Sequence, residues 1–382
     1  MNRIIIIFFS LFFISSVLFA QKDGPISEPD FYTNPGWEYY SDNTLSSVAS
    51  GKGYTGIAGL GDISFVSLNP ASLDVNKKFQ LYLGYTYKSS LDRSYYSPDL
   101  FYKPAFPSVF VGGAFRINKY LQAGLIYQNS YSYKVVFENF VYTNNEGQII
   151  GIGEFGDKFV AHSLTVPIVF NYNWLRIGAN LNITYSRTDM IQDYSSPEFP
   201  YNSFRSNLWR FNPKLGFIIS PNKYFSFGGT FEPGFSDSTE WISDNPTYNT
   251  KQPVKYPNRI SLGTELRLLD DKLNISLDYL YANTKANLYM KDMSNVHIGL
   301  EYKINETWKL RSGFFTLYDY RELDPRIGYG DELGSYDQYF ITFGGTYKLN
   351  NFSFNLAFLD SHLLNTTKAA HTKITGGISY DF

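Results

Sequence analysis

Apolar and polar residues alternate along most of the chain from Phe79 to its end. Between residues 175 and 185, for example, every odd position holds Leu, Ile, Ala or Tyr, and every even position holds Arg, Gly, Asn or Thr. A period of two is typical of strands whose two faces meet different surroundings, and few segments show the period of a helix. The alternating runs predict an all-β chain of fourteen strands, near 79–88, 107–117, 121–133, 159–172, 175–188, 204–219, 224–235, 258–268, 273–283, 294–304, 308–319, 339–349, 352–362 and 372–382.

The connections between these strands alternate in length. Every second connection is a short turn, and the connections between these turns are longer loops, for example 135–158, 236–257 and 320–338. Short turns on one side and long loops on the other are typical of an antiparallel transmembrane β-barrel, in which an even strand number leaves both ends on the periplasmic side. A secreted β-sandwich has no reason to sort its loops in this way, so the barrel is favoured. The short turns are Asn118-Lys119, Asn173, Pro221-Asn222, Asp270-Asp271, Asn305-Glu306 and Asn350.

Composition agrees with a barrel and excludes several other classes. Aromatic residues make up 19% of the 382 residues, yet the mean hydropathy is only −0.24. A barrel reconciles these values because only alternate residues face lipid, whereas a helical membrane protein would be more apolar overall. A net charge of −2 lacks the basic excess of a nucleic-acid-binding protein. Because the chain contains no Cys, it has neither disulfides nor cysteine-based chemistry.

The first residues predict export. Arg3 precedes an almost wholly apolar run at 4–19, and the small residue Ala20 stands before a polar sequence that begins at Gln21. This arrangement is typical of a cleavable signal peptide, and the run is short for a spanning helix. We therefore expect a signal peptide at 1–20, in a protein that contacts outer-membrane lipid and the barrel-assembly machinery of a Gram-negative bacterium.

A glycine recurs at one depth on the polar face of most predicted strands. Glycine is expected where another backbone approaches a strand closely, so we predict that a segment packs against the inner wall there. Residues 21–77 lack strand alternation and are the candidate for this N-terminal luminal hatch, or plug, with the barrel at 78–382. The set, which we call the glycine girdle, is Gly84, Gly112, Gly124, Gly178, Gly216, Gly228, Gly263, Gly299, Gly313, Gly344 and Gly377.

The second half of the predicted hatch is rich in glycine. It reads Ser-Gly-Lys-Gly-Tyr-Thr-Gly-Ile-Ala-Gly-Leu-Gly-Asp from Ser50 to Asp62, and Asn69-Pro70-Ala71 follows. A Gly-rich stretch can cradle phosphate, but no strand-to-helix context with a P-loop lysine accompanies it. A compact irregular segment with a turn at Asn69-Pro70 is the better interpretation, and no cofactor is expected.

In these features the chain resembles the FadL/TodX family of outer-membrane transporters of long-chain fatty acids and other hydrophobic compounds. The resemblance is carried by the Gly-rich run, Asp62, Asn69-Pro70-Ala71 with a Leu two residues on, the fourteen strands and a terminal aromatic residue. It implies a hatch-closed barrel, a hydrophobic ligand captured near the outer loops, and lateral exit through the wall near the third strand, with Asn69, Pro70 and Ala71 beside the opening. The stretch 21–48 is longer than the family leads us to expect.

Two other functions stay open. Barrels of protein-secretion machinery of the PorV type carry a similar Gly-rich hatch with Asn-Pro-Ala, which would imply secretion-system partners. A general porin would leave the lumen open, and the 57-residue segment 21–77 argues against that. Catalysis and metal binding are not expected, because the four His are scattered, with His162 and His297 on lumen-facing positions, and no Gly-x-Ser-x-Gly is present.

Lumen-facing cations are candidates for two roles. Such residues commonly form hydrogen-bonded ladders that hold a plug. Arg210 and Arg311 are also predicted toward mid-wall, where a guanidinium can bind an acidic head group bidentately. Trp209 and Phe211 add apolar surface beside Arg210, so these four residues form the predicted ligand site. The full inward set of cations is Arg176, Arg210, Lys214, Arg259, Arg267, Lys303, Arg311 and Lys348.

A proline in the fourth predicted strand and the aromatic end of the chain point to two further roles. Pro167 of the fourth strand stands at the girdle level next to the third strand with its Gly124, and it cannot donate a ladder hydrogen bond. The seam between these strands is therefore either a lateral exit or a bulge that re-aims the wall. At the end of the chain, Phe382 with Tyr380 on the same face looks like the sorting signal that barrel-assembly machinery reads.

Overall fold

In this computed structural model the described residues are 45–92, 108–143, 148–193, 202–244, 246–284, 291–318, 320, 337–364 and 369–382. The predicted signal peptide and residues 21–44 of the predicted hatch lie outside them. Within the described residues, no helix is both long enough and apolar enough to cross a membrane.

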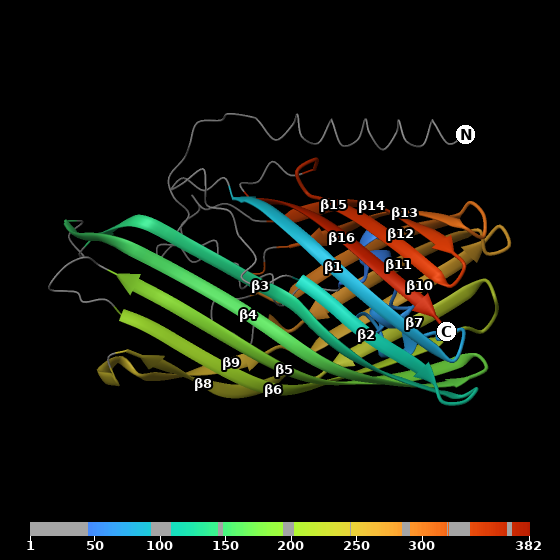
Figure 1. The fold of residues 1–382 in the computed structure, drawn as a ribbon, viewed down its shortest axis with the longest axis horizontal. Coiled ribbons are helices and arrows are strands. Elements are labelled where there is room, and N and C mark those ends of the chain that lie inside the picture. Colours follow the sequence, from blue (N-terminus) through green and yellow to red (C-terminus); the bar gives the residue numbers. More distant parts are fainter. Residues whose placement is uncertain are drawn as a thin grey trace.

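The described strands form a closed antiparallel barrel of fourteen strands (Figure 1). The ring closes where β1 pairs with β16, and β10 follows β7 in the ring because β8 and β9 form a separate hairpin beside β6. The predicted fold class is confirmed. The barrel strands are β1 (Phe79–Asp92), β2 (Ser108–Arg116), β3 (Leu121–Thr143), β4 (Ile149–Tyr172), β5 (Leu175–Asp193), β6 (Asn202–Ile219), β7 (Phe225–Glu232), β10 (Arg259–Leu268), β11 (Leu273–Ala282), β12 (Met293–Lys303), β13 (Trp308–Leu317), β14 (Gln338–Leu349), β15 (Phe352–Asp360) and β16 (Ala369–Asp381).

Local chemistry explains the short turns. Asn173 and Asn350 have positive φ values of 51° and 53°, a conformation that Asn tolerates better than most residues. In the turn before β3, the side-chain oxygen of Asn118 accepts a hydrogen bond from the backbone N–H of Tyr120 at 2.8 Å, and Asn222 makes the equivalent bond before β7. These turns gather at one end of the barrel, which we call the short-turn end.

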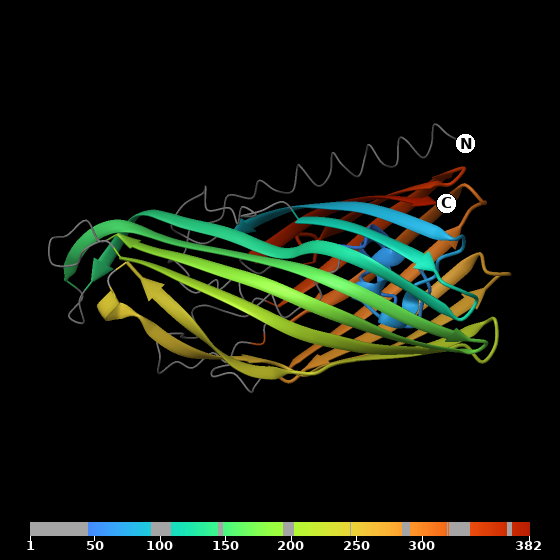
Figure 2. The ribbon, with the colours of Figure 1, turned by 60° about the horizontal axis from the view of Figure 1, so that its bottom comes forward.

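β3 and β4 are much longer than the alternation predicts, and two further strands occupy a predicted loop. The sequence predicts loops at 135–158 and 236–257, but β3 and β4 run through most of the first, and the second contains β8 (Phe235–Ser243) and β9 (Thr250–Tyr256). These two loop predictions are wrong. Where water meets both sides of a sheet, strands pair without an apolar face, so the sequence shows no alternation to mark them. β3 to β6 and the hairpin thus form a sheet that projects beyond the other strands (Figures 1 and 2). We call it the extended sheet.

The two faces of the wall differ as the alternation requires. Outward side chains such as Leu83, Leu125 and Ile177 are 55%, 54% and 51% exposed, as expected for a surface that meets lipid. The inward face carries glycine and buried polar residues such as Gln80 and Thr342. The core therefore lies inside the barrel rather than on its outer surface.

The described part of the predicted hatch, residues 45–77, occupies the barrel interior toward the short-turn end (Figure 2). We call it the luminal segment. It contains the short helix α2 (Ser47–Gly51) and the 3-10 turns η2 (Ile63–Ser67) and η3 (Pro70–Ser72). Side-chain oxygens of Ser46, Asp62 and Asn69 cap these three elements, which explains how such short turns persist away from water.

Phe382 joins the last strand to the first. Its backbone N–H donates to the carbonyl oxygen of Phe79 at 2.8 Å, and its ring centroid lies 5.4 Å from that of Phe79 and 4.5 Å from that of Tyr380. Deleting Phe382 should lower the heat-modifiable, folded form in outer membranes, measured by comparing boiled and unboiled samples on a gel. Phe382→Tyr, which keeps the ring, should leave the yield near wild type. An unchanged folded yield after the deletion would argue against a role in assembly.

Candidate functional site

The glycine girdle is where the luminal segment meets the wall. Each of the eleven girdle glycines has an atom of the luminal segment next to the place where a Cβ atom would stand. At Gly178 that place is 2.5 Å from the backbone nitrogen of Ala71, and at Gly344 it is 2.8 Å from the Cα atom of Gly51. A side chain at either position would displace the segment or the strand. The close approach predicted from the girdle is confirmed.

Cations of β5 and β6 bind backbone carbonyls of the luminal segment. Arg176 is buried, and its Nε donates to the carbonyl oxygen of Ala71 at 3.0 Å. Lys214, also buried, donates through Nζ to the carbonyl oxygen of Ser67 at 2.8 Å. Without these donors the carbonyls would lose hydrogen bonds in a place with little water. The prediction that inward cations hold the plug is thus confirmed for Arg176 and Lys214.

The Gly-rich run is held by carboxylates of the opposite wall. Oδ2 of the buried Asp278 accepts hydrogen bonds from the backbone N–H groups of Gly56 and Ile57 at 2.7 and 3.0 Å. Lys52 forms an ion pair with Glu265 across 3.2 Å, with both side chains almost fully buried. The N–H groups that a nucleotide-binding loop would offer to phosphate are here satisfied by the protein itself. This geometry explains the Gly-rich sequence as packing against the wall.

The Asn69-Pro70-Ala71 turn ties two parts of the luminal segment to β6. Asn69 Nδ2 donates to the carbonyl oxygens of Ile57 at 2.6 Å and Phe217 at 3.1 Å, while its Oδ1 accepts from the N–H of Ala71 at 2.9 Å. The turn packs on Gly178 and Gly216, which belong to β5 and β6. It therefore lies beside the fifth and sixth strands rather than against the third, near which the family resemblance implies an opening.

The ladder between β3 and β4 is interrupted at the girdle level. Pairing includes Ala123 with Ile168 and resumes at Ile126 with Thr165, but the two pairs between them are missing. Those positions are Gly124 opposite Pro167 and Leu125 opposite Val166. Since Pro167 has no N–H, it cannot complete the ladder. The weak point predicted from Pro167 and Gly124 is present in the wall.

Ile63 of η2 covers this interruption from inside. Its Cδ1 atom lies 3.0 Å from the place of a Cβ on Gly124, and Cγ of Pro167 lies 3.2 Å from the same place. Ile63 itself is fully buried, and its backbone N–H donates to Gln80 Oε1 at 2.9 Å. Sequence reasoning missed Ile63, because nothing in its local sequence marks it apart from neighbouring apolar residues.

A second feature that the sequence analysis missed is an apolar cluster on the inner wall, farther from the short-turn end than the girdle. Phe315 and Phe340 stack with centroids 4.5 Å apart, and Tyr54 of the luminal segment lies 4.9 Å from Phe315. We call this group the luminal apolar cluster. The available signal was that inward positions of β13 and β15 change from glycine or polar residues near the short-turn end to apolar residues farther along the strand. Its other members are Ala282, Met293, Leu317, Tyr320, Ala357 and Leu359.

The predicted ligand site around Arg210 is not assembled as expected. Trp209 and Phe211 are 67% and 59% exposed and lie on the outer face of β6, because neighbouring residues of a strand point to opposite faces. Arg210 lies on the other face, with its guanidinium 4.3 Å from the ring centroid of Tyr256 in β9. Trp209 and Phe211 therefore do not line a pocket with Arg210.

Arg311 lies in a different part of the barrel. It is buried three residues into β13 from the short-turn end, where Nε donates to Glu301 Oε2 at 2.6 Å and Nη1 donates to Thr346 Oγ1 at 2.7 Å. The expectation of a mid-wall position for Arg311 is wrong, because the register of β13 places it between the girdle and the turn. Its guanidinium is already engaged by a carboxylate of the wall.

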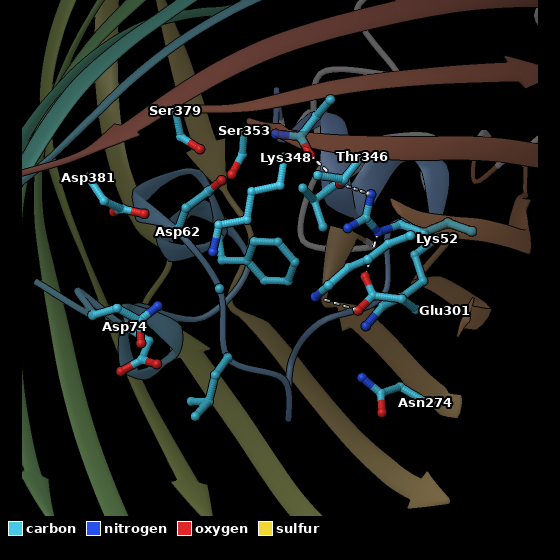
Figure 3. A pocket seen from close by; sticks show the side chains of 18 of the residues that line it. Lys52, Asp62, Asp74, Asn274, Glu301, Thr346, Lys348, Ser353, Ser379 and Asp381 are labelled. Atoms are coloured by element: carbon cyan, nitrogen blue, oxygen red, sulfur yellow. Dashed lines mark hydrogen bonds and ion pairs between the residues drawn. The ribbon is translucent and has the colours of Figure 1, made fainter. Parts of the chain in front are cut away.

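A polar cavity of about 270 Å³ lies between the luminal segment and the short turns, lined in part by Arg311 (Figure 3). Lys52, Asp62, Glu301 and Lys348 point toward it from the segment and from β12 and β14. Burial raises the pKa of the Asp62 carboxyl, against the opposing effects of its hydrogen bonds from Ser64 and of the charge of Arg311. Among the described residues, no three His, Asp or Glu side chains are grouped as metal ligands.

The two predicted luminal histidines lie on opposite faces. His297 is inward and buried, with Nδ1 2.9 Å from the carbonyl oxygen of Gly53. His162 is outward, with Nδ1 2.8 Å from the hydroxyl of Tyr127, so its lumen-facing assignment is wrong. The inward positions of β4 are those of the buried Ala161 and Ser163, one residue to either side.

Comparison with known proteins identifies the fold. No protein-family model matches the chain, and no curated protein matches its sequence. The toluene transporter TbuX of Ralstonia pickettii is similar in structure, with a TM-score of 0.61 and 14% identity over 89% of this chain and 98% of that one. The toluene transporter TodX of Pseudomonas putida has a TM-score of 0.59 and 14% identity, over 88% of this chain and 97% of that one. A FadL homologue of Pseudomonas aeruginosa has a TM-score of 0.57 and 14% identity, over 88% of this chain and 98% of that one. The chain therefore has the barrel fold of the FadL/TodX channels.

Proposed function

We propose that the protein is a channel for hydrophobic small molecules in the outer membrane of a Gram-negative bacterium. The observation that carries this proposal is the interior of the barrel, where the luminal segment packs on every girdle glycine while the luminal apolar cluster lies beyond it. A segment packed against all sides of the wall opposes free diffusion of polar solutes. The cluster makes this part of the inner wall apolar, although its members are only 0–4% exposed, and an apolar wall suits a hydrophobic rather than a polar cargo. The toluene transporters with this fold support the same class of cargo.

We further propose that cargo leaves sideways through the β3–β4 seam. The support for this route is the interruption of the ladder, in which two consecutive residue pairs of β3 and β4 are missing. Separating the strands there costs less than breaking a complete ladder. Ile63 would have to move, since it covers Gly124 and Pro167 from the lumen. An apolar cargo would then enter the hydrocarbon layer without crossing the polar cavity at the short-turn end.

Uptake assays in cells that lack related channels test the proposed function. Cells that produce the protein should take up a long-chain fatty acid or toluene faster than cells with an empty vector, and should not take up sucrose faster. Equal stimulation of sucrose would indicate a general porin. No stimulation of any solute, with a protein partner co-purifying from detergent extracts, would favour a secretion-system component.

Arg210 offers a test of head-group recognition. Its guanidinium is on the inner face and packs on Tyr256, so a carboxylate could replace part of that contact. Arg210→Ala should reduce fatty-acid uptake several-fold and leave toluene uptake within about twofold, a difference that reflects one charge-assisted hydrogen bond. Arg311→Ala serves as the matched control, since Arg311 is paired with Glu301. Equal losses for acid and hydrocarbon in Arg210→Ala would contradict the proposed role.

A further inference from the structure

The outer face of β3 to β6 carries a row of cations directly beyond an aromatic row. His162, Tyr185 and Trp209 stand side by side in the register of β4, β5 and β6, and the rings of Tyr185 and Trp209 are 4.9 Å apart. Toward the short-turn end the outward residues of β5 are Ile183, Leu181, Ala179 and Ile177, none of them charged. The aromatic row is therefore the upper edge of the apolar band.

Strand geometry agrees with this depth. Ten residues separate Leu175, at the short-turn end, from Tyr185. At about 3.3 Å per residue and a tilt of about 40°, they span roughly 25 Å along the barrel axis, which is the height of the apolar band of such barrels. Exposed aromatic residues, Tyr172 and Trp174, mark the lower edge. Residues four positions beyond Tyr185 stand about 10 Å higher, at the depth of lipid head groups.

Three cations and one carboxylate occupy that higher level. Lys134, Lys158, Asp189 and Arg205 are cross-strand neighbours in β3, β4, β5 and β6, and paired residues of an antiparallel sheet share one face. Arg187 lies on the same face, two residues below Asp189. Both lysines are exposed, and the side chain of Arg205 is 57% exposed. We call Lys134, Lys158, Arg187 and Arg205 the basic cluster.

One carboxylate organises the cluster without neutralising it. Asp189 accepts from Arg187 Nε at 2.8 Å and from Arg205 Nε at 2.9 Å, so it fixes both guanidinium groups. Among the residues whose side chains the structure describes, no carboxylate forms an ion pair with Lys134 or Lys158. The result is a preorganised surface with more positive than negative charge, above an apolar wall that continues down through Phe211 and Ile183.

We propose that the basic cluster binds the phosphate groups of a phosphorylated lipid in the outer leaflet. Guanidinium and ammonium groups at head-group depth match phosphate, and the apolar residues below match acyl chains. This inference rests on the outer-membrane location in the proposed function but not on transport, because the cluster faces away from the lumen. The bound lipid would lie along the outer surface of the extended sheet.

The test uses full-length protein purified in detergent and native mass spectrometry with two added lipids, diphosphorylated lipid A and the same lipid without phosphates. Wild type should retain the phosphorylated lipid at least about tenfold more tightly. The variant Lys134→Gln, Lys158→Gln, Arg205→Gln should lose that preference. The control Lys119→Gln, Lys223→Gln, Lys272→Gln removes three exposed cations at the short-turn end and should keep it. Heat-modifiability verifies that each variant is folded, and Arg205→Gln alone should lose part of the preference if the triple variant does not fold.

Three outcomes would overturn the proposal. These are equal retention of both lipids by wild type, a folded cluster variant that behaves like wild type, and full competition by inorganic phosphate, which would indicate an anion site without lipid. Toluene uptake by the folded cluster variant should equal that of wild type. A failure of lipid retention with normal uptake would thus count against the lipid site alone, and the reverse would count against the channel alone.

Discussion

Oxidised Leu125→Cys, Val166→Cys protein should take up long-chain fatty acid at no more than about a tenth of the wild-type rate, and a reductant should restore uptake. These residues form one of the two pairs missing from the β3–β4 ladder. Opposed residues of antiparallel strands have Cα atoms about 4.5–5.5 Å apart, within reach of a disulfide. Because the chain contains no other Cys, the introduced pair is the only one that can form. Radiolabelled fatty acid measures the rate.

A matched disulfide separates the seam from any general effect of cross-linking. Leu164→Cys, Ile183→Cys joins β4 to β5 in the next seam, where the ladder is complete, and both side chains face outward as Leu125 does. Its oxidised form should transport at the wild-type rate. Uptake that continues through the oxidised β3–β4 link would refute the lateral route while leaving the barrel and its luminal segment as described.

Gly178→Leu should loosen the luminal segment and make it sensitive to protease added from the periplasmic side. The Cβ of the new side chain would lie 2.5 Å from the backbone nitrogen of Ala71. Because the atoms in contact are backbone atoms, no flexible side chain can move aside to make room. Overfilling of this kind costs about 1–3 kcal/mol. Arg176 would also be pulled from the carbonyl oxygen that it now binds. Limited proteolysis in outer-membrane vesicles, followed by mass spectrometry of the fragments, gives the measurement.

Gly376→Leu is the control, since among the described residues no atom outside Gly376 and its two chain neighbours lies within 4 Å of the place of its Cβ. It adds the same side chain to a strand of the same barrel, and its protease resistance should match that of wild type. If Gly178→Leu were equally resistant, the girdle would not be what holds the luminal segment in place.

The sequence was sufficient for the parts of the fold that the bilayer constrains. Where one face of a strand meets lipid and the other meets water or protein, alternation is enforced, and the fourteen strands followed from it. The girdle was predictable because only glycine leaves room for a second backbone, as Gly178 and Gly344 demonstrate. The weak seam was predictable because a proline in a ladder lacks a donor.

The candidate site was harder to predict for physical reasons. Beyond the bilayer both faces of the extended sheet meet water, so the pattern that defines a strand disappears while pairing continues. Trp209 and Phe211 are adjacent to Arg210 in sequence, but adjacency in a strand means opposite faces. Arg311 was predicted to bind ligand because its ion-pair partner could not be foreseen. Glu301 lies opposite Arg311 only through the register of β12 and β13, which a single sequence does not specify.

The way in which the luminal segment touches the wall also has a consequence for folding. Contacts to the girdle draw on strands from β1 to β16, and Gly51 meets Gly344, almost three hundred residues later in the chain. Such contacts give a high contact order, and they form only after the loops between them have closed. The pairing of β16 with β1 completes the ring around the segment. Enclosure of the segment and closure of the barrel are therefore expected to be one late, cooperative event, and variants that weaken either should slow the same folding phase.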